Sequence, residues 1–203
     1  MTDIIVVHGT PGAGKSTHSI KLAQFSLDER PIFHISAGNR LRDVRIGEFN
    51  SAFNAEINNP NAPMLLDHQI VNGVIFEYIS QCPPDSIVLV DGYPRFTDAI
   101  DLFVEAIKEG GHKLLGCINL SISLETCMSR LSGRGSRRGE RIGNTRDFVE
   151  KRFSDHLTYT TEAVNKLEEI VPVINIDAES NEQVVWESVN EAVRRLVYSI
   201  FEA

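Results

Sequence analysis

Residues 9–17 read GTPGAGKST and directly follow the apolar run IIVV at residues 4–7. The stretch from Gly9 to Ser16 meets the pattern G-x-x-x-x-G-K-[ST], which is typical of a loop that wraps the phosphates of a nucleoside triphosphate. Glycines let such a loop bend so that successive N–H groups converge on phosphate oxygens, and the following helix directs its positive end at the same anion. A glycine-rich turn without function is the alternative, but the strand before the loop and the helical pattern after it favour a phosphate site.

The polar side chains that close this loop have the chemistry that a triphosphate requires. Lys15 is long enough to reach the β- and γ-phosphates, and the hydroxyl of Ser16 or Thr17 can face Mg²⁺. The loop therefore predicts which phosphates are held, but it does not predict the acceptor of a phosphoryl group.

Apolar runs that predict strands alternate with helical patterns along the chain. Strands are predicted at 4–8, 32–35, 87–91, 114–120 and 171–176. Helices are predicted at 15–27, 67–81, 97–109, 124–131, 144–170 and 182–200. This alternation indicates an α/β fold with three layers, in which helices cover both faces of a five-stranded parallel sheet. Ligands of such sheets bind at the carboxyl ends of the strands, where the phosphate loop also lies.

Two stretches interrupt the alternation within a single domain that is predicted to span residues 1–203. Residues 37–66 are polar and rich in asparagine, and residues 133–143 are rich in glycine and arginine. Long connections at the ligand end of a sheet are commonly lids or binding loops. We therefore expect both segments to contact ligand.

Charge and composition exclude several classes of protein. The net charge of −8 argues against a nucleic-acid surface, which needs a broad basic footprint. No apolar run approaches the ~20 residues of a membrane span, and the first residues carry no basic, cleavable leader pattern. The three cysteines, at positions 82, 117 and 127, lack C-x-x-C spacing and fit a reducing compartment. We expect a cytoplasmic monomer that binds neither nucleic acid nor membrane.

Arginine is concentrated in one strip of this acidic chain. Eight of the 20 lysines and arginines fall within residues 130–152. They are Arg130, Arg134, Arg137, Arg138, Arg141, Arg146, Lys151 and Arg152. A solvated helix face or a patch for an acidic partner is one interpretation. The other is an arginine lid over polyphosphate, because phosphoryl transfer depends on positioning and on cations around the transferring group.

Two further segments carry candidate phosphate-site residues. Asp91 ends a predicted strand and can orient Mg²⁺ or its waters, although a helix-capping role is the alternative. The turn Gly92-Tyr93-Pro94-Arg95 follows and directs a guanidinium back over the sheet edge.

The second segment, residues 34–42, reads HISAGNRLR. Gly38 permits close approach of a ligand, and Arg42 lies one turn further on. Arg40 and Arg45 are interpreted as surface charges. The six histidines show no metal-ligand spacing and receive no role.

These motifs together resemble the adenylate kinase family of nucleoside monophosphate kinases, in order and over nearly the whole chain. GTPGAGKST is similar to the family's phosphate loop, HISAGNRLR to its H-[IL]-S-[TA]-G-[DE]-x-L-R segment, and VDGYPR to its D-G-[FY]-P-R signature. The eleven-residue separation of Arg141 and Arg152 is similar to that of two lid-side arginines. The resemblance implies a P-loop NTPase fold, with 37–66 as the monophosphate-binding segment and 133–143 as a short lid.

The resemblance also implies a role for each matching residue. ATP would be held by Gly12, Ala13, Gly14, Lys15, Ser16, Thr17, Arg130 and Arg134, with Arg130 packed on its base. The monophosphate would be bound by Ala37, Gly38, Arg42, Leu65, Gly92, Tyr93, Pro94, Arg95, Arg141 and Arg152. The catalytic cations would be Lys15, Arg95, Arg134, Arg141 and Arg152. Mg²⁺ would be held by Ser16 and Asp91, directly or through water.

Five positions depart from the family pattern. Adenylate kinases carry threonine at the position of Ala37. Uridylate/cytidylate kinases resemble this chain in carrying alanine there. Ala99 replaces the glutamine that reads the AMP base, where uridylate/cytidylate kinases have asparagine. Asn39 replaces an aspartate, and Gly143-Asn144 replace two aspartates that brace the closed lid.

The sequence therefore predicts a Mg²⁺-dependent, reversible transfer of phosphoryl from ATP to a nucleoside monophosphate, with AMP or UMP/CMP as acceptor. A nucleotide-binding or sensor protein with little catalysis is a second hypothesis, motivated by the departures at Asn39, Ala99, Gly143 and Asn144. A P-loop kinase for another small phosphate acceptor is a third.

Overall fold

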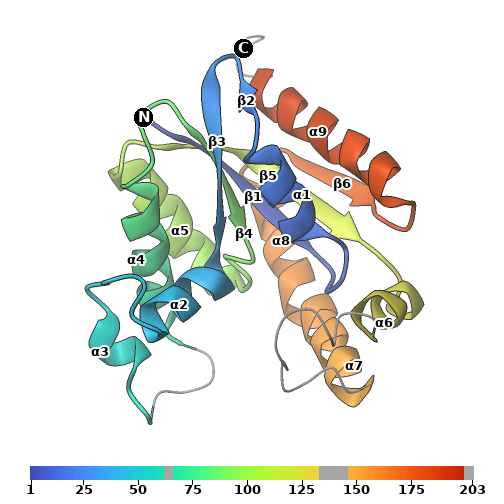
Figure 1. The fold of residues 1–203 in the computed structure, drawn as a ribbon, viewed down its shortest axis with the longest axis horizontal. Helices are drawn as coiled ribbons and strands as arrows, with labels where there is room; N and C mark the ends of the chain where they lie inside the picture. The colour runs from blue at the N-terminus through green and yellow to red at the C-terminus, as the bar shows by residue number, and fades with distance from the viewer. Residues whose placement is uncertain (62–65, 133–145, 199–203) are drawn as a thin grey trace.

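A computed structural model describes residues 1–61, 66–132 and 146–198, and Figure 1 shows a central sheet with helices on both sides. The elements are β1 (Asp3–Gly9), α1 (Lys15–Leu22), β2 (Ser26–Leu27), β3 (Arg30–Ser36), α2 (Ala37–Arg45), α3 (Asn54–Ile57), α4 (His68–Ile79), β4 (Ile87–Asp91), α5 (Thr97–Glu109), β5 (Lys113–Ser121), α6 (Leu124–Ser132), α7 (Arg146–Asp155), the π-helical turn η1 (His156–Thr160), α8 (Thr161–Glu168), β6 (Val173–Asp177) and α9 (Glu182–Tyr198). The predicted α/β alternation is confirmed.

Five parallel strands form the body of the sheet in the order β3-β4-β1-β5-β6. The predicted parallel sheet is therefore confirmed, and β1 lies at its centre. The connection from β1 leads to β3 on one side, whereas the connection from β4 crosses β1 to β5 on the other side. The loop after β1 thus lies where the chain changes direction across the sheet, which is the usual ligand position in such folds.

A short sixth strand extends the sheet at its β3 edge. Helix α1 ends at Leu22, five residues before the predicted end at residue 27, and β2 pairs antiparallel with the start of β3. Asp28 and Glu29 form the two-residue turn between them with φ of 50° and 64°. Positive φ at both central residues is the geometry of a tight hairpin turn, so this turn ends the helical stretch. The extra strand is a correction to the predicted count of five.

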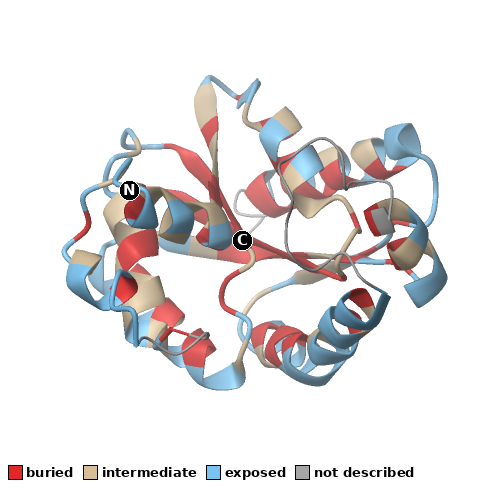
Figure 2. Ribbon diagram, turned by 60° about the horizontal axis from the view of Figure 1, so that its bottom comes forward, coloured by how far each residue is buried: buried red, intermediate tan, exposed pale blue. Residues whose placement is uncertain are grey.

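The core lies on both faces of β1, every residue of which is buried (Figure 2). Ile5 and Val7 pack with side chains of α1 and α9, whereas Ile4 and Val6 pack with side chains of α4, α5 and α8. Alternate residues of a strand point to opposite faces, so β1 contributes to both layers of helices. Each such buried side chain stabilises the fold by roughly 1.5–3 kcal/mol.

The segment after β3 has a small core of its own. Val44 of α2 and Ile57 of α3 pack with Leu66 and with Val74 of α4. These side chains belong to a separate cluster from the two that flank the sheet. Helices α2 and α3 therefore pack on α4, while Ala37 at the start of α2 belongs to the cluster beside the sheet.

Figure 1 shows α2 and α3 on one side and α6 and α7 on the other, at the same end of the sheet. The predicted helix at 144–170 is a helical stretch from Arg146 to Glu168, formed by α7, η1 and α8. Its first two predicted residues, and residues 199–200 of the last predicted helix, lie outside the described residues. None of the helices within the described ranges combines the length and apolar character needed to cross a bilayer.

Candidate active site at the phosphate loop

The phosphate loop begins where β1 ends, and glycine is required there. A Cβ on Gly9 would lie 2.2 Å from the carbonyl oxygen of Leu120, so no side chain fits between β1 and β5. The loop ends at Gly14, which caps α1 in the left-handed conformation with φ 93°. This turn directs the first N–H groups of α1 to the carboxyl end of the sheet, where a helix N-terminus binds anions.

The Lys15 side chain folds back over this loop. Its Nζ donates hydrogen bonds to the carbonyl oxygens of Gly9 at 2.6 Å and Thr10 at 2.9 Å. Burial lowers the pKa of Lys15 to about 8; the Asp91 carboxylate opposes this change, and the positive charges of Arg95 and Arg152 favour it. The ammonium therefore lies among other cations, in surroundings that an anionic phosphate would complement.

Ser16 and Asp91 meet beside Lys15. The Ser16 hydroxyl donates a hydrogen bond of 2.5 Å to Oδ2 of Asp91, and Nε2 of His34 lies 3.4 Å from the same oxygen. Burial alone would raise the pKa of Asp91, but the hydrogen bond from His34, the charge of Lys15 and the Ser16 hydroxyl together lower it. Asp91 is therefore an ionised carboxylate at neutral pH.

This pair fits the Mg²⁺ ion that a phosphate loop implies. Mg²⁺ prefers oxygen ligands and usually takes one or two carboxylates, with phosphate oxygens and water completing its octahedron. Ser16 and Asp91 offer one hydroxyl and one carboxylate side by side. Within residues 1–61, 66–132 and 146–198, no group of three or more histidine, cysteine or acidic side chains is arranged to hold a metal ion. The donor set therefore suits an ion that arrives with nucleotide.

Arg95 lies over the turn that follows β4. Its Nε donates a hydrogen bond of 2.7 Å to the carbonyl oxygen of Gly92. Gly92 has φ 81°, and a Cβ there would come within 2.9 Å of Nη2 of Arg95. The neighbouring Tyr93 is buried, and its hydroxyl donates to the carbonyl oxygen of His68 at 3.3 Å. Pro94 is also buried, so this turn is fixed beneath an exposed guanidinium.

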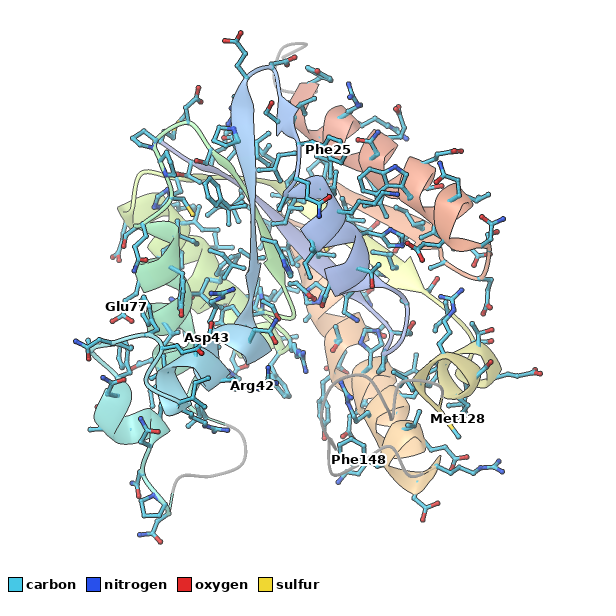
Figure 3. All side chains as sticks on the ribbon, viewed as in Figure 1. Phe25, Arg42, Asp43, Glu77, Met128 and Phe148 are labelled. Atoms are coloured by element: carbon cyan, nitrogen blue, oxygen red, sulfur yellow. The ribbon has the colours of Figure 1, made fainter. Side chains whose placement is uncertain are left out.

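The predicted acceptor-side residues on α2 lie at the start and the last turn of that helix. Ala37 is its buried first residue, and Gly38 is exposed. Arg42 is exposed, and its Nη1 donates to Oδ1 of Asn39 at 2.9 Å. An aspartate would neutralise this guanidinium, whereas the amide of Asn39 leaves its charge in place. Figure 3 shows Arg42 at the end of the molecule where α7 carries Phe148.

Arg130 connects α6 to two loops. Its Nη1 lies 3.5 Å from the carbonyl oxygen of Gly12 in the phosphate loop, and its Nη2 donates to the carbonyl oxygens of Ala178 at 2.9 Å and Ser180 at 3.2 Å. The structure thus brings Arg130 to the phosphate loop, as predicted for an ATP-side residue. The roles of these contacts toward ligand remain predictions.

Arg152 lies in the last turn of α7, with its guanidinium carbon 5.7 Å from the centre of the Phe148 ring. It is near enough to Lys15 to lower the pKa of that ammonium. Four other predicted residues or segments, Leu65, Arg134, Arg141 and 133–143, lie outside the described residues.

Three histidines at this site were not predicted from the sequence. His34 binds Asp91, while His8 and His156 lie near enough to Lys15 and Arg95 for those charges to lower their pKa values. Their spacing in the sequence gives no metal-site signal, because they come from β1, β3 and η1. The available signal was the position of His8 and His34 near the carboxyl ends of predicted strands.

Ala99 stands where the sequence comparison expected the family's base-reading glutamine. Ala99 is fully buried and packs in the core with Ile100 and Phe103. It is not available to an acceptor base. The surface nearby is aromatic: the Phe96 ring lies 5.2 Å from the His68 ring and 5.4 Å from the Tyr159 ring.

The fold and the phosphate loop define a P-loop α/β protein. The AAA domain family matches residues 8–148, and the chain belongs to this family. It is 33% identical over 131 residues to an adenylate kinase of Syntrophomonas wolfei, covering 64% of this chain and 58% of the relative. An adenylate kinase of Streptococcus uberis is 30% identical over 134 residues, covering 64% and 59%, and one of Streptococcus pneumoniae 28% over 131 residues, also covering 64% and 59%.

These matches confirm the resemblance to the adenylate kinase family. The chain spans less than two thirds of the length of each of these curated relatives.

Proposed function

We propose that this protein is a Mg²⁺-dependent kinase that transfers phosphoryl reversibly from ATP to a nucleoside monophosphate. The observation that carries the proposal is the arrangement around Lys15. Arg95 and Arg152 lie near enough to its ammonium to lower its pKa, and the Ser16–Asp91 pair lies beside it. Phosphoryl transfer needs cations around the transferring group and little covalent chemistry, so this arrangement suits it.

In this proposal ATP occupies the loop from Gly12 to Thr17. The N–H groups at the start of α1 bind its phosphates, and Lys15 exchanges its two carbonyl contacts for β- and γ-phosphate oxygens. Arg130 would pack on the ATP base, and its contacts with the carbonyl oxygens of Gly12 and Ala178 support this role. Arg134 would contact the phosphates.

The acceptor monophosphate would lie between α2 and the turn after β4. Arg42, Arg95, Arg141 and Arg152 would bind its phosphate and the phosphoryl group in transfer. Ala37, Gly38, Leu65 and the turn from Gly92 to Pro94 would line the pocket. Holding both phosphates in line among fixed cations lowers the barrier without a covalent enzyme intermediate.

Ser16 and Asp91 would hold Mg²⁺, directly or through water. The ion would supply positive charge at the transferring phosphoryl group and orient the triphosphate. The carboxylate is suited to this role because its pKa is lowered and it stays ionised.

We also propose that residues 37–66 and 133–143 close over the two nucleotides. The first is supported by the small core of that segment, in which Val44, Ile57 and Leu66 pack with Val74 apart from the two clusters that flank the sheet. We further propose that the protein is a cytoplasmic monomer. Its three free cysteines, Cys82, Cys117 and Cys127, fit a reducing compartment.

A coupled assay with MgATP and AMP, UMP and CMP in parallel tests the proposal. At least one acceptor should give ADP well above the rate without acceptor. If no acceptor does so, the kinase proposal fails.

The burial of Ala99 favours a second candidate, a P-loop kinase for another small phosphate acceptor. That candidate predicts that a screen of phosphorylated metabolites yields a better acceptor than any nucleotide. Tight nucleotide binding without any transfer would instead indicate a sensor.

A further inference from the structure

Two histidines lie together behind the phosphate loop. His8 is the penultimate residue of β1 and only 2% exposed. Alternation along the strand places its side chain on the face of Ile4 and Val6, which packs with α5 and α8. The π-helical turn η1, which begins at His156, packs against β1, and His156 lies near enough to His8 to lower the pKa of that imidazole.

One imidazole nitrogen of this pair stands out by its surroundings. Within the part of the chain that the structure describes, no group forms a hydrogen bond with the buried Nε2 of His8. Buried polar atoms are generally hydrogen-bonded, and those that are not commonly mark functional sites. Nε2 of His8 is therefore available to a group that becomes a donor in another state of the protein.

The surroundings keep both imidazoles neutral before nucleotide binds. Burial lowers the pKa of His8 to about 3, with further contributions from Arg95, His156 and Lys15, whereas Asp91 opposes it. Burial, Lys15 and Arg95 lower the pKa of His156 to about 4. The charged groups that act on these imidazoles are Lys15 of α1 and Arg95 after β4 for both histidines, and Asp91 of β4 for His8.

We propose that His156, supported by His8, is a further phosphate-site residue that takes up a proton when a nucleoside triphosphate binds. The inference rests on the ATP site of the proposed function. A triphosphate brings several negative charges to Lys15 and Arg95 and offsets their repulsion of an imidazolium. His156 is only half-buried and is therefore the easier of the two to protonate. His8 stays neutral, and its Nε2 accepts the additional N–H of His156.

The direction of the pH effect follows from linkage. Binding raises the pKa of His156 above its value of about 4 in the free protein. Between the two values, the complex holds one proton more than the free protein. The affinity for ATP therefore gains from falling pH in this window, by at most about tenfold per pH unit for one proton.

The test is an NMR titration of ¹⁵N-histidine-labelled protein between pH 5 and 8, with and without saturating MgATP. His156→Asn assigns the His156 signal. His112→Asn is the matched control, because His112 lies at the turn between α5 and β5, away from the phosphate loop. His156 should show no titration above pH 5 in the free protein and a midpoint at least about one pH unit higher with MgATP. The His112 midpoint should not move.

A second measurement uses the same variants. The ratio of wild-type to His156→Asn affinity for MgATP should rise as pH falls, whereas the ratio for His112→Asn should stay constant. A His156 signal that does not titrate in the ATP complex would overturn the inference, while ATP binding and phosphoryl transfer in that sample would leave the proposed function intact. Failure to bind MgATP at any pH would overturn both. If His156→Asn fails to fold, His156→Gln supplies both the assignment of the His156 signal and the affinity ratio.

Discussion

The Ser16 hydroxyl donates a 2.5 Å hydrogen bond to the Asp91 carboxylate, although 75 positions separate the two residues in the chain. Parallel pairing of β1 with β4, in which Val7 lies opposite Asp91, brings the two loops together. The hydroxyl at the start of α1 and the carboxylate at the end of β4 therefore lie side by side at the carboxyl end of the sheet. This pair is the proposed Mg²⁺ site.

Replacing Asp91 by asparagine should weaken that site. Asp91→Asn keeps the size of the side chain but removes the negative oxygen that accepts from Ser16. We expect turnover to fall by about 10–100-fold and the Mg²⁺ concentration for half-maximal rate to rise. Initial rates at increasing Mg²⁺ and fixed ATP measure both effects.

Asp177→Asn is the matched control, because Asp177 also ends a strand and accepts a local hydrogen bond from the backbone of Glu179. Its Mg²⁺ dependence should equal that of the wild type. An unchanged Mg²⁺ dependence in Asp91→Asn would exclude Asp91 from the metal site.

Lys15→Met should reduce turnover by about 10²–10³-fold or more, because it removes a charge that stabilises the transferring phosphoryl group. The fold should persist, since the methionine keeps the apolar stem of the side chain. Lys21→Met is the control, because Lys21 lies on the same helix with its ammonium 4.2 Å from the Trp186 ring, away from the loop. Equal losses in the two variants, with equal thermal unfolding, would contradict the role of Lys15.

The affinity for ATP should fall as pH rises through about 8. Burial lowers the pKa of Lys15 to about 8, so the free protein loses this charge above that pH. Bound phosphate favours the charged form, hence binding takes up a proton there, and affinity falls by at most about tenfold per pH unit. Calorimetric titrations from pH 7 to 9.5 measure the slope. Lys15→Met should flatten it, and a wild-type profile as flat as that of the variant would refute the assignment.

Gly92→Ala should impair both stability and transfer. Its φ of 81° costs an alanine about 1–2 kcal/mol, and the new Cβ would lie 2.9 Å from Nη2 of Arg95. Gly111→Ala offers a matched control, because Gly111 has φ 66° and no atom of the described residues would lie within 4 Å of its new Cβ. Both variants should lose similar unfolding free energy, but only Gly92→Ala should lose turnover. Full activity in Gly92→Ala would show that the position of Arg95 is unimportant.

The sequence predicted those parts of the fold that depend on short stretches of chain, namely the buried parallel strands and the glycine-rich phosphate loop. The apolar runs predicted β1, β4 and β5 within one or two residues, since continuous burial of parallel strands leaves a clear pattern. The glycine pattern predicted the phosphate loop because close approach to Leu120 and a left-handed cap leave no alternative residue.

Long-range features were not predictable in this way. The hairpin of β2 and β3 depends on Asp28 and Glu29 at positive φ; aspartate tolerates this conformation, but glutamate carries no turn signal. His8 and His156 are 148 positions apart in the chain, and they come near each other because η1 packs against β1. A local sequence pattern cannot predict such a contact. The burial of Ala99 likewise follows from how α5 packs on the sheet.

The most direct test of the central claim follows the fate of the γ-phosphate. The protein is incubated with γ-³²P-labelled MgATP and AMP, UMP or CMP, and labelled products are separated. We predict that label appears in a nucleoside diphosphate made from the acceptor, and that Lys15→Met abolishes this transfer. Label found only in inorganic phosphate, or retained in ATP with every acceptor, would contradict the account.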